Sequence, residues 1–103
     1  MRIIDVNQHG MSGDTMLHIA AWNGCVEDIE KLILVGADIN SIGDLGNTPL
    51  HQAILFEKIE SVKLLLNYNI NANIKNESGE TIYEMAKRNG NKEIINLLAK
   101  YRK

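Results

Sequence analysis

The strongest constraint on the fold of this chain is an internal repeat with a period of 33 residues. The segments GDTMLHIAAWNG, GNTPLHQAILFE and GETIYEMAKRNG begin at Gly13, Gly46 and Gly79. An alanine and a leucine recur in the same register in all three units: Ala20, Ala53 and Ala86, then Leu32, Leu65 and Leu98. Because a unit of this length cannot bury its apolar residues alone, the period predicts a solenoid in which neighbouring units stack and share one core.

The period also divides the chain. We expect a single repeat domain over residues 1–103, with the end of a partial unit at 1–12 and further units at 13–45, 46–78 and 79–103. In each unit the spacing of apolar residues predicts two short helices joined by a tight turn. The first helices are expected to begin near Thr15, Thr48 and Thr81, and the second near Val26, Ile59 and Lys92.

The histidine of the segment GNTPLHQA, His51, has two interpretations: a ligand or base in a chemical site, or a residue that helps to begin a helix. A threonine followed three residues later by glutamate forms a capping box, in which the two side chains satisfy free backbone N–H groups. Thr81 and Glu84 have this spacing, and His18 and His51 occupy the place of Glu84 in the other units. We therefore expect His51 to have a structural role, and we expect glutamate to be tolerated in its place.

Together, the period, the Thr48-Pro49-Leu50-His51 motif and the Gly36-Ala37-Asp38-Ile39-Asn40 segment resemble the ankyrin-repeat family. The resemblance covers essentially the whole chain. It implies an all-α ankyrin solenoid of stacked helix–turn–helix units, with β-hairpin-like loops set nearly perpendicular to the helices. It also implies a concave surface that binds another protein, and no catalytic activity in the repeats.

Departures from the family pattern bear on the fold. Glu57 replaces the glycine that lies between the two helices of the other units, so we expect a different turn there. In the third unit, Lys87 and Lys92 occupy places that are apolar in the earlier units. This is typical of a capping unit whose outer face is exposed to solvent. At the other end, Ile3 and Ile4 are the sizeable apolar residues expected to cover the first unit.

Several classes of function find no support in the sequence. The single cysteine, Cys25, excludes an intrachain disulfide and favours a reducing compartment, so we expect a cytoplasmic protein. The chain offers no converging set of three or four zinc ligands and no glycine-rich phosphate loop. No apolar run reaches the roughly 20 residues that a bilayer requires, and the basic C-terminal part lacks interleaved aromatic residues. We therefore expect no catalytic site, cofactor, metal, small-molecule substrate, nucleic acid or membrane partner.

The resemblance instead implies a protein-binding surface, formed by the loop tips and by the inner face of the first helix of each unit. Carried over by position, the candidates in the loops are Met11, Ser12, Asp14, Asp44, Leu45, Asn47, Glu77, Ser78 and Glu80. The candidates on the helices are Trp22, Asn23, Leu55, Phe56, Arg88 and Asn89. Large aromatic side chains often anchor protein interfaces, which favours a contact role for Trp22 and Phe56. The alternative is that Trp22, Leu55 and Phe56 pack against neighbouring helices.

Charge is distributed unevenly along the chain. Residues 1–73 carry 4 Lys or Arg against 9 Asp or Glu, a net charge of −5, whereas residues 74–103 carry 7 against 4, a net charge of +3. A partner protein with a basic surface would be attracted to the acidic part. Two roles fit: a stand-alone inhibitor, such as an immunity protein that neutralises a basic toxin, or an adaptor or scaffold subunit, including a fragment of a longer ankyrin array.

Overall fold

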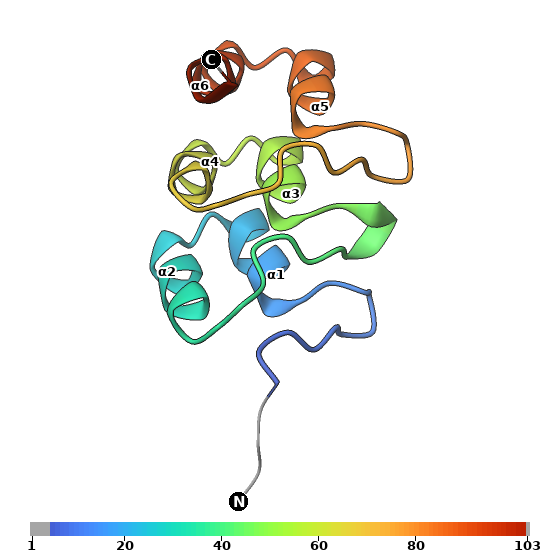
Figure 1. Cartoon of the computed structure of the whole chain (residues 1–103), viewed down its shortest axis with the longest axis vertical. Helices are drawn as coiled ribbons and strands as arrows, with labels where there is room; N and C mark the ends of the chain where they lie inside the picture. The colour runs from blue at the N-terminus through green and yellow to red at the C-terminus, as the bar shows by residue number, and fades with distance from the viewer. Residues whose placement is uncertain (1–4, 103) are drawn as a thin grey trace, which may run out of the picture.

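The fold is a stack of three helix pairs (Figure 1). The computed structural model describes residues 5–102, so Ile3 and Ile4 lie outside the described residues. The pairs are α1 (Met16–Asn23) with α2 (Val26–Leu34), α3 (Pro49–Leu55) with α4 (Ile59–Leu66), and α5 (Ile82–Asn89) with α6 (Lys92–Arg102). Residues 5–102 contain no β-strand, which confirms the predicted all-α solenoid.

The helices form two columns (Figure 1). The first helices, α1, α3 and α5, lie in one column, and α2, α4 and α6 lie in the other. The loops that enter the first helices project beyond the first column, and the second of them includes a short 3-10 turn, η1 (Asp44–Gly46). In each loop a backbone hydrogen bond joins two residues that are four positions apart. These bonds run from Gly10 N–H to Asp14 O (2.8 Å), from Gly43 N–H to Asn47 O (2.8 Å) and from Asn76 N–H to Glu80 O (3.0 Å). The same sequence period therefore produces three loops of the same form.

The first helices begin where the threonines predict. Thr15, Thr48 and Thr81 are the N-cap residues, and each forms a complete capping box with the residue three positions later. Pro49 adds a second start signal to α3, because proline at the first helical position gives up an N–H that has no helical partner. The local sequence thus fixes both the start of each first helix and its direction of entry.

The turn after α3 differs from our expectation. Gly24 and Gly90, between the helices of the outer two units, have left-handed backbones with φ of 77° and 75°. Glu57 adopts the same conformation with φ of 56°, so the expectation of a different turn is wrong. A residue with a side chain pays roughly 1–2 kcal/mol for this conformation. The Asn91 side chain offsets part of that cost by donating from Nδ2 to Glu57 Oε1 at 2.8 Å.

His51 links two units as well as capping a helix. Its Nδ1 accepts from the Thr48 N–H at 3.1 Å, and its Nε2 donates to the Glu80 carbonyl oxygen of the next unit at 3.0 Å. His18 repeats this arrangement, with Nε2 at 2.7 Å from the Asn47 carbonyl oxygen. Both imidazoles are fully buried, and burial lowers the pKa of each below the ordinary value of 6.5. The predicted structural role is confirmed. Because a carboxylate cannot donate to the Glu80 carbonyl oxygen, we now expect glutamate to be poorly tolerated at position 51.

The core is continuous between the two columns. Its members recur at equivalent places in successive units, as the shared period predicts: Leu17, Ala20, Ile29, Leu50, Ala53, Ile54, Val62, Leu65, Ile82, Met85, Ala86, Ile94 and Leu98. Leu32 is only partly buried, whereas Leu65 and Leu98 at the same position in later units are buried. The difference follows from stacking, because each of those two leucines lies against the preceding helix pair.

Candidate functional site

The candidate surface follows the column of first helices and the loops beside it. Asp14, Asn47 and Glu80 share one repeat position in the loops, and Trp22, Leu55 and Arg88 share one on the helices. In the third unit these two positions are in direct contact, because Arg88 Nε and Nη2 donate to the two carboxylate oxygens of Glu80 at 2.6 and 3.1 Å. The loops and the helix positions therefore form one surface rather than two.

The largest apolar feature of this surface is an aromatic pair. Trp22 lies on α1 and Phe56 directly follows α3, and their ring centroids are 5.4 Å apart with a tilt of 43°. Trp22 is 42% exposed and Phe56 is 44% exposed, although each packs on the other. Leu55, beside them, is half-buried. The pair is thus braced by its own contact while a large part of both rings faces solvent.

The loop tips are exposed and tied to one another. Met11, Ser12, Asp44, Leu45, Glu77 and Ser78 are all exposed, and Asp14 is half-buried. Asp14 Oδ1 accepts from the Asp44 N–H at 2.9 Å, and the Leu45 carbonyl accepts from the Glu77 N–H at 2.9 Å. Since each tip is bonded to the next, the three loops present their side chains as one row.

Leu45 has an unusual combination of backbone and exposure. Its φ of 58° lies in the left-handed region, which leucine rarely adopts, and its side chain is 58% exposed. Neither burial nor backbone preference accounts for a leucine at this tip. Such residues concentrate at sites of function, which makes Leu45 a strong candidate among the loop residues.

One predicted surface residue is buried. Asn47 is only 2% exposed, so its expected exposure at a loop tip is wrong. Its side-chain Oδ1 accepts from Asn76 Nδ2 at 2.9 Å, and its carbonyl oxygen accepts from His18 Nε2. Asn47 therefore joins neighbouring loops, and a partner cannot reach it.

Two further candidate residues, Arg88 and Asn89, form hydrogen bonds within the chain. Arg88 holds the pKa of Glu80 below its ordinary value through their paired hydrogen bonds, so these charges neutralise each other on the surface. Asn89 is half-buried and donates from Nδ2 to the Ile54 carbonyl at 2.9 Å, which ties α5 to α3. Asn23, at the equivalent place in the first unit, is exposed. The accessible part of the surface is consequently concentrated in the first two units.

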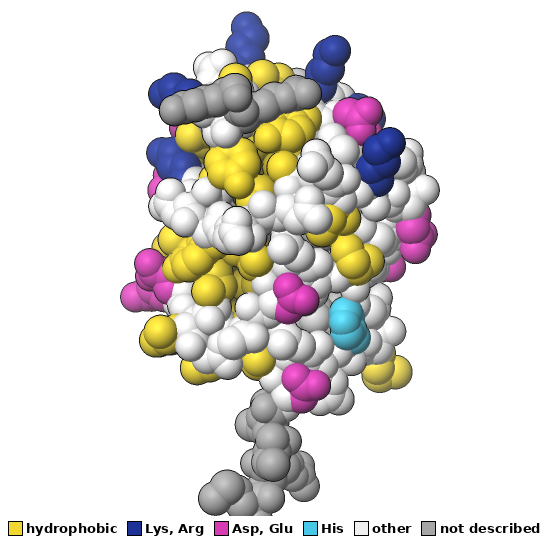
Figure 2. All heavy atoms as spheres, viewed as in Figure 1, with side chains coloured by type: hydrophobic (Ala, Val, Ile, Leu, Met, Phe, Trp, Pro, Cys, Tyr) yellow, Lys and Arg dark blue, Asp and Glu magenta, His cyan; other side chains and the backbone are white. Residues whose placement is uncertain are grey.

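The charge of the surface changes along the stack. In the view of Figure 2, most Lys and Arg side chains lie at the end of the molecule formed by α5 and α6. Asp44 and Glu77 are exposed acids at the loop tips, and Asp14 lies beside them. The aromatic pair therefore lies in the acidic part of the molecule.

Sequence reasoning did not select one exposed apolar region. Met16 is 53% exposed and Ile19 is 41% exposed, and both line a groove between α1 and α2. The signal was available in the repeat, since Met16 and Ile19 stand at the repeat positions of the apolar residues Ile82 and Met85. This groove is not lined by Trp22 or Phe56, and Asn23 is the residue that it shares with the candidate surface.

Neither a metal centre nor a membrane segment is found in the described part of the chain. Within residues 5–102, no three His, Cys, Asp or Glu residues lie close enough together to hold a metal ion. No helix in that range is both long enough and apolar enough to cross a bilayer.

The family comparison agrees with this architecture. Residues 17–103 match the family model for ankyrin repeats, in three copies. A search of curated proteins found no match. Ankyrin repeats generally mediate protein–protein interactions and are generally not enzymes. The match covers most of the chain, so the chain belongs to the ankyrin-repeat family.

Proposed function

We propose that this chain is a non-enzymatic module that binds a partner protein through one defined surface. This surface, called the inner-helix surface below, consists of Met11, Ser12, Asp14, Trp22, Asn23, Asp44, Leu45, Leu55, Phe56, Glu77, Ser78, Glu80 and Arg88. The observation that carries the proposal is the aromatic pair, because Trp22 and Phe56 expose more than two-fifths of their surface in a fold that has no need of it. Large aromatic side chains at the centre of a surface are the usual anchors of protein interfaces.

The charges around the pair favour a partner with a basic surface. Asp44 and Glu77 are exposed at the tips, and Asp14 is accessible between them and the helices. Fixed acidic groups that border an apolar anchor attract a cationic partner and orient it before contact. The more specific proposal is an inhibitor that covers its partner in the cytoplasm, such as an immunity protein that neutralises a basic toxin.

The test is affinity capture from a lysate of the native cells with matched baits. Wild type is compared with the Trp22→Ala/Phe56→Ala variant and with a Leu34→Ala/Val35→Ala control. The control removes apolar side chains that are 85% and 66% exposed at the end of α2, outside the inner-helix surface. We expect wild type and control to retain the same protein and the aromatic variant to lose it. Retention by the aromatic variant would contradict the proposal.

The captured protein then distinguishes the specific roles. An inhibitor predicts one predominant partner whose own activity falls when this chain is added at equal concentration. An adaptor predicts a partner whose activity is unchanged and which recruits further proteins through the complex. If the partner is basic, Asp14→Lys with Asp44→Lys should slow association, because exposed charges act mainly on the rate of encounter.

A further inference from the structure

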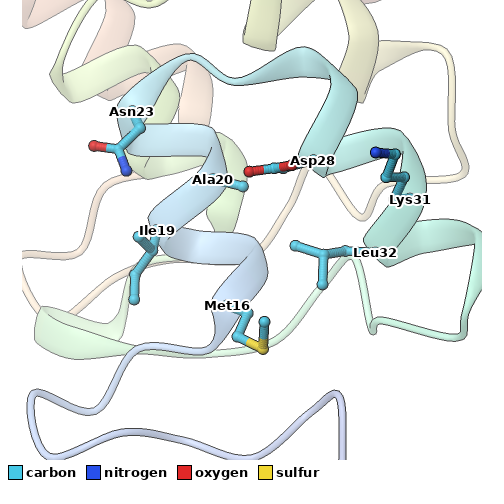
Figure 3. A pocket seen from close by; sticks show the side chains of 7 residues that line it. All are labelled: Met16, Ile19, Ala20, Asn23, Asp28, Lys31 and Leu32. Atoms are coloured by element: carbon cyan, nitrogen blue, oxygen red, sulfur yellow. The ribbon is translucent and has the colours of Figure 1, made fainter.

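The end of the stack formed by α1 and α2 carries an open groove (Figure 3). Its volume is about 430 Å³, and it is lined by Met16, Ile19, Ala20, Asn23, Asp28, Lys31 and Leu32. Figure 3 shows Asp28 reaching from α2 toward α1, with Met16 and Leu32 at one end of the groove. The groove lies at the end of the solenoid, whereas the inner-helix surface runs along its side.

The equivalent positions in the later units are faces on which helices pack. Ile82 and Met85 stand at the repeat positions of Met16 and Ile19, and each is only 2% exposed because α5 lies against the preceding helix pair. Met16 and Ile19, by contrast, are 53% and 41% exposed. The first unit therefore has apolar residues at the positions that pack between units elsewhere, but no described helix pair covers them.

Two charges make this face unlike its counterparts. Asp28 stands at the position of Ser61 and Ile94, which are both fully buried. Lys31 stands three residues later on the same helix, and neither charge has an ion-pair partner within residues 5–102. A repeat stacked on this face in the usual way would bury the Asp28 carboxylate without a cation, which is costly. An occupant of the groove must bring a cation to Asp28 and an anion to Lys31.

We propose that the occupant is a second copy of this chain, related by a two-fold axis. Asp28 and Lys31 lie about one turn apart on α2, so antiparallel packing of two α2 helices brings Asp28 of each copy to Lys31 of the other. A two-fold axis forms both ion pairs at once and packs the Met16 and Ile19 side chains of the two copies together. Apart from Asn23, which also lines the groove, the dimer leaves both inner-helix surfaces free, so this inference does not depend on the proposed function.

The first test is the mass of the purified full chain in solution. Sedimentation equilibrium over a range of concentrations should show a monomer–dimer equilibrium for wild type. Ile19→Glu, which places a charge on the apolar part of the groove, should shift the chain to monomer while its melting curve shows that it is folded. A wild type that remains monomeric throughout the range would overturn the proposal.

Charge exchange provides the sharper test, because it identifies the contact itself. Asp28→Lys and Lys31→Asp each place like charges opposite one another in a two-fold dimer, and each should weaken self-association by about tenfold or more. When the two variants are mixed, both contacts pair opposite charges again, so a heterodimer should form with an affinity close to that of wild type. The double variant Asp28→Lys/Lys31→Asp should also dimerise by itself. Failure of the mixture to associate would overturn the two-fold arrangement.

Glu27→Lys is the matched control for Asp28→Lys. Glu27 lies in the same first turn of α2 as Asp28 and is exposed, but it does not line the groove. The control makes the same change in net charge and in the interaction with the helix dipole. We expect Glu27→Lys to dimerise like wild type. Equal weakening by Glu27→Lys and Asp28→Lys would show a general charge effect and would contradict the proposed contact.

Discussion

Replacing His51 by glutamate should strongly destabilise this protein, although the third unit carries glutamate at the same repeat position. In the structure, His51 Nδ1 accepts from the Thr48 N–H, which leaves Nε2 to donate to the Glu80 carbonyl oxygen at 3.0 Å. A carboxylate can reproduce the first bond, as Glu84 does with the Thr81 N–H at 2.9 Å. It cannot reproduce the second, because it has no proton to donate at neutral pH.

The magnitude follows from these contacts and from burial. The lost bond to Glu80 contributes about 1 kcal/mol net, and the Glu80 carbonyl keeps the Asn76 N–H as a donor. The larger cost is the carboxylate itself, because a buried charge without a partner costs about 3–5 kcal/mol. The side chain at position 51 is fully buried, so the introduced carboxylate also loses its hydration. We expect a loss of at least about 3 kcal/mol in the free energy of unfolding, which is a large part of the 5–15 kcal/mol typical of a domain.

The assay is urea unfolding at neutral pH, followed by circular dichroism, with Glu84→His as the matched control. Glu84 is exposed, and no described helix pair follows the third unit. The imidazole introduced there can accept from the Thr81 N–H, so we expect the control to remain within about 0.5 kcal/mol of wild type. Equal losses for the two variants would refute the reasoning, because the bond between units would then contribute nothing.

Three further predictions concern stability. The unfolding free energy should fall as the pH is lowered below about 6.5, because burial lowers the pKa of His18 and His51 and the unfolded chain then binds more protons. The slope in urea titrations is at most about 2.7 kcal/mol per pH unit for two such groups, and a flat profile between pH 7 and 5 would contradict the prediction. Thr48→Ala should cost about 1 kcal/mol in the same assay through loss of the N-cap, with no change at Thr48→Ser as the control. Leu45→Asn should raise the unfolding free energy by about 0.5–1 kcal/mol, since asparagine tolerates the left-handed backbone better, and it should weaken partner binding; a loss of stability would show that the exposed leucine packs after all.

The fold was predictable because its determinants are local and repeated. Thr15, Thr48 and Thr81 mark the helix starts through short-range hydrogen bonds, and the 33-residue register identifies the stacked core. The turn at Glu57 escaped prediction because the requirement there is set by the surrounding helices. Their packing imposes a left-handed backbone on a residue that does not favour it, and Asn91 partly offsets the cost.

The site was less predictable because exposure depends on contacts between units. Asn47 and Asp44 are both polar loop residues, yet Asn47 is buried by bonds to Asn76 and His18 whereas Asp44 faces solvent. The second bond of His51 was missed for the same reason, since its acceptor lies 29 residues away in the next unit. Repeat position alone cannot distinguish a residue that joins two loops from one that meets a partner.

The most direct test of the central claim is the affinity of the captured partner for Trp22→Ala, measured by isothermal titration beside Leu34→Ala. Both variants shorten an exposed apolar side chain, but only Trp22 belongs to the inner-helix surface. We predict that Trp22→Ala weakens binding by about 30-fold, equivalent to about 2 kcal/mol, and that Leu34→Ala binds like wild type. Unchanged affinity of folded Trp22→Ala would contradict the claim that this surface holds the partner.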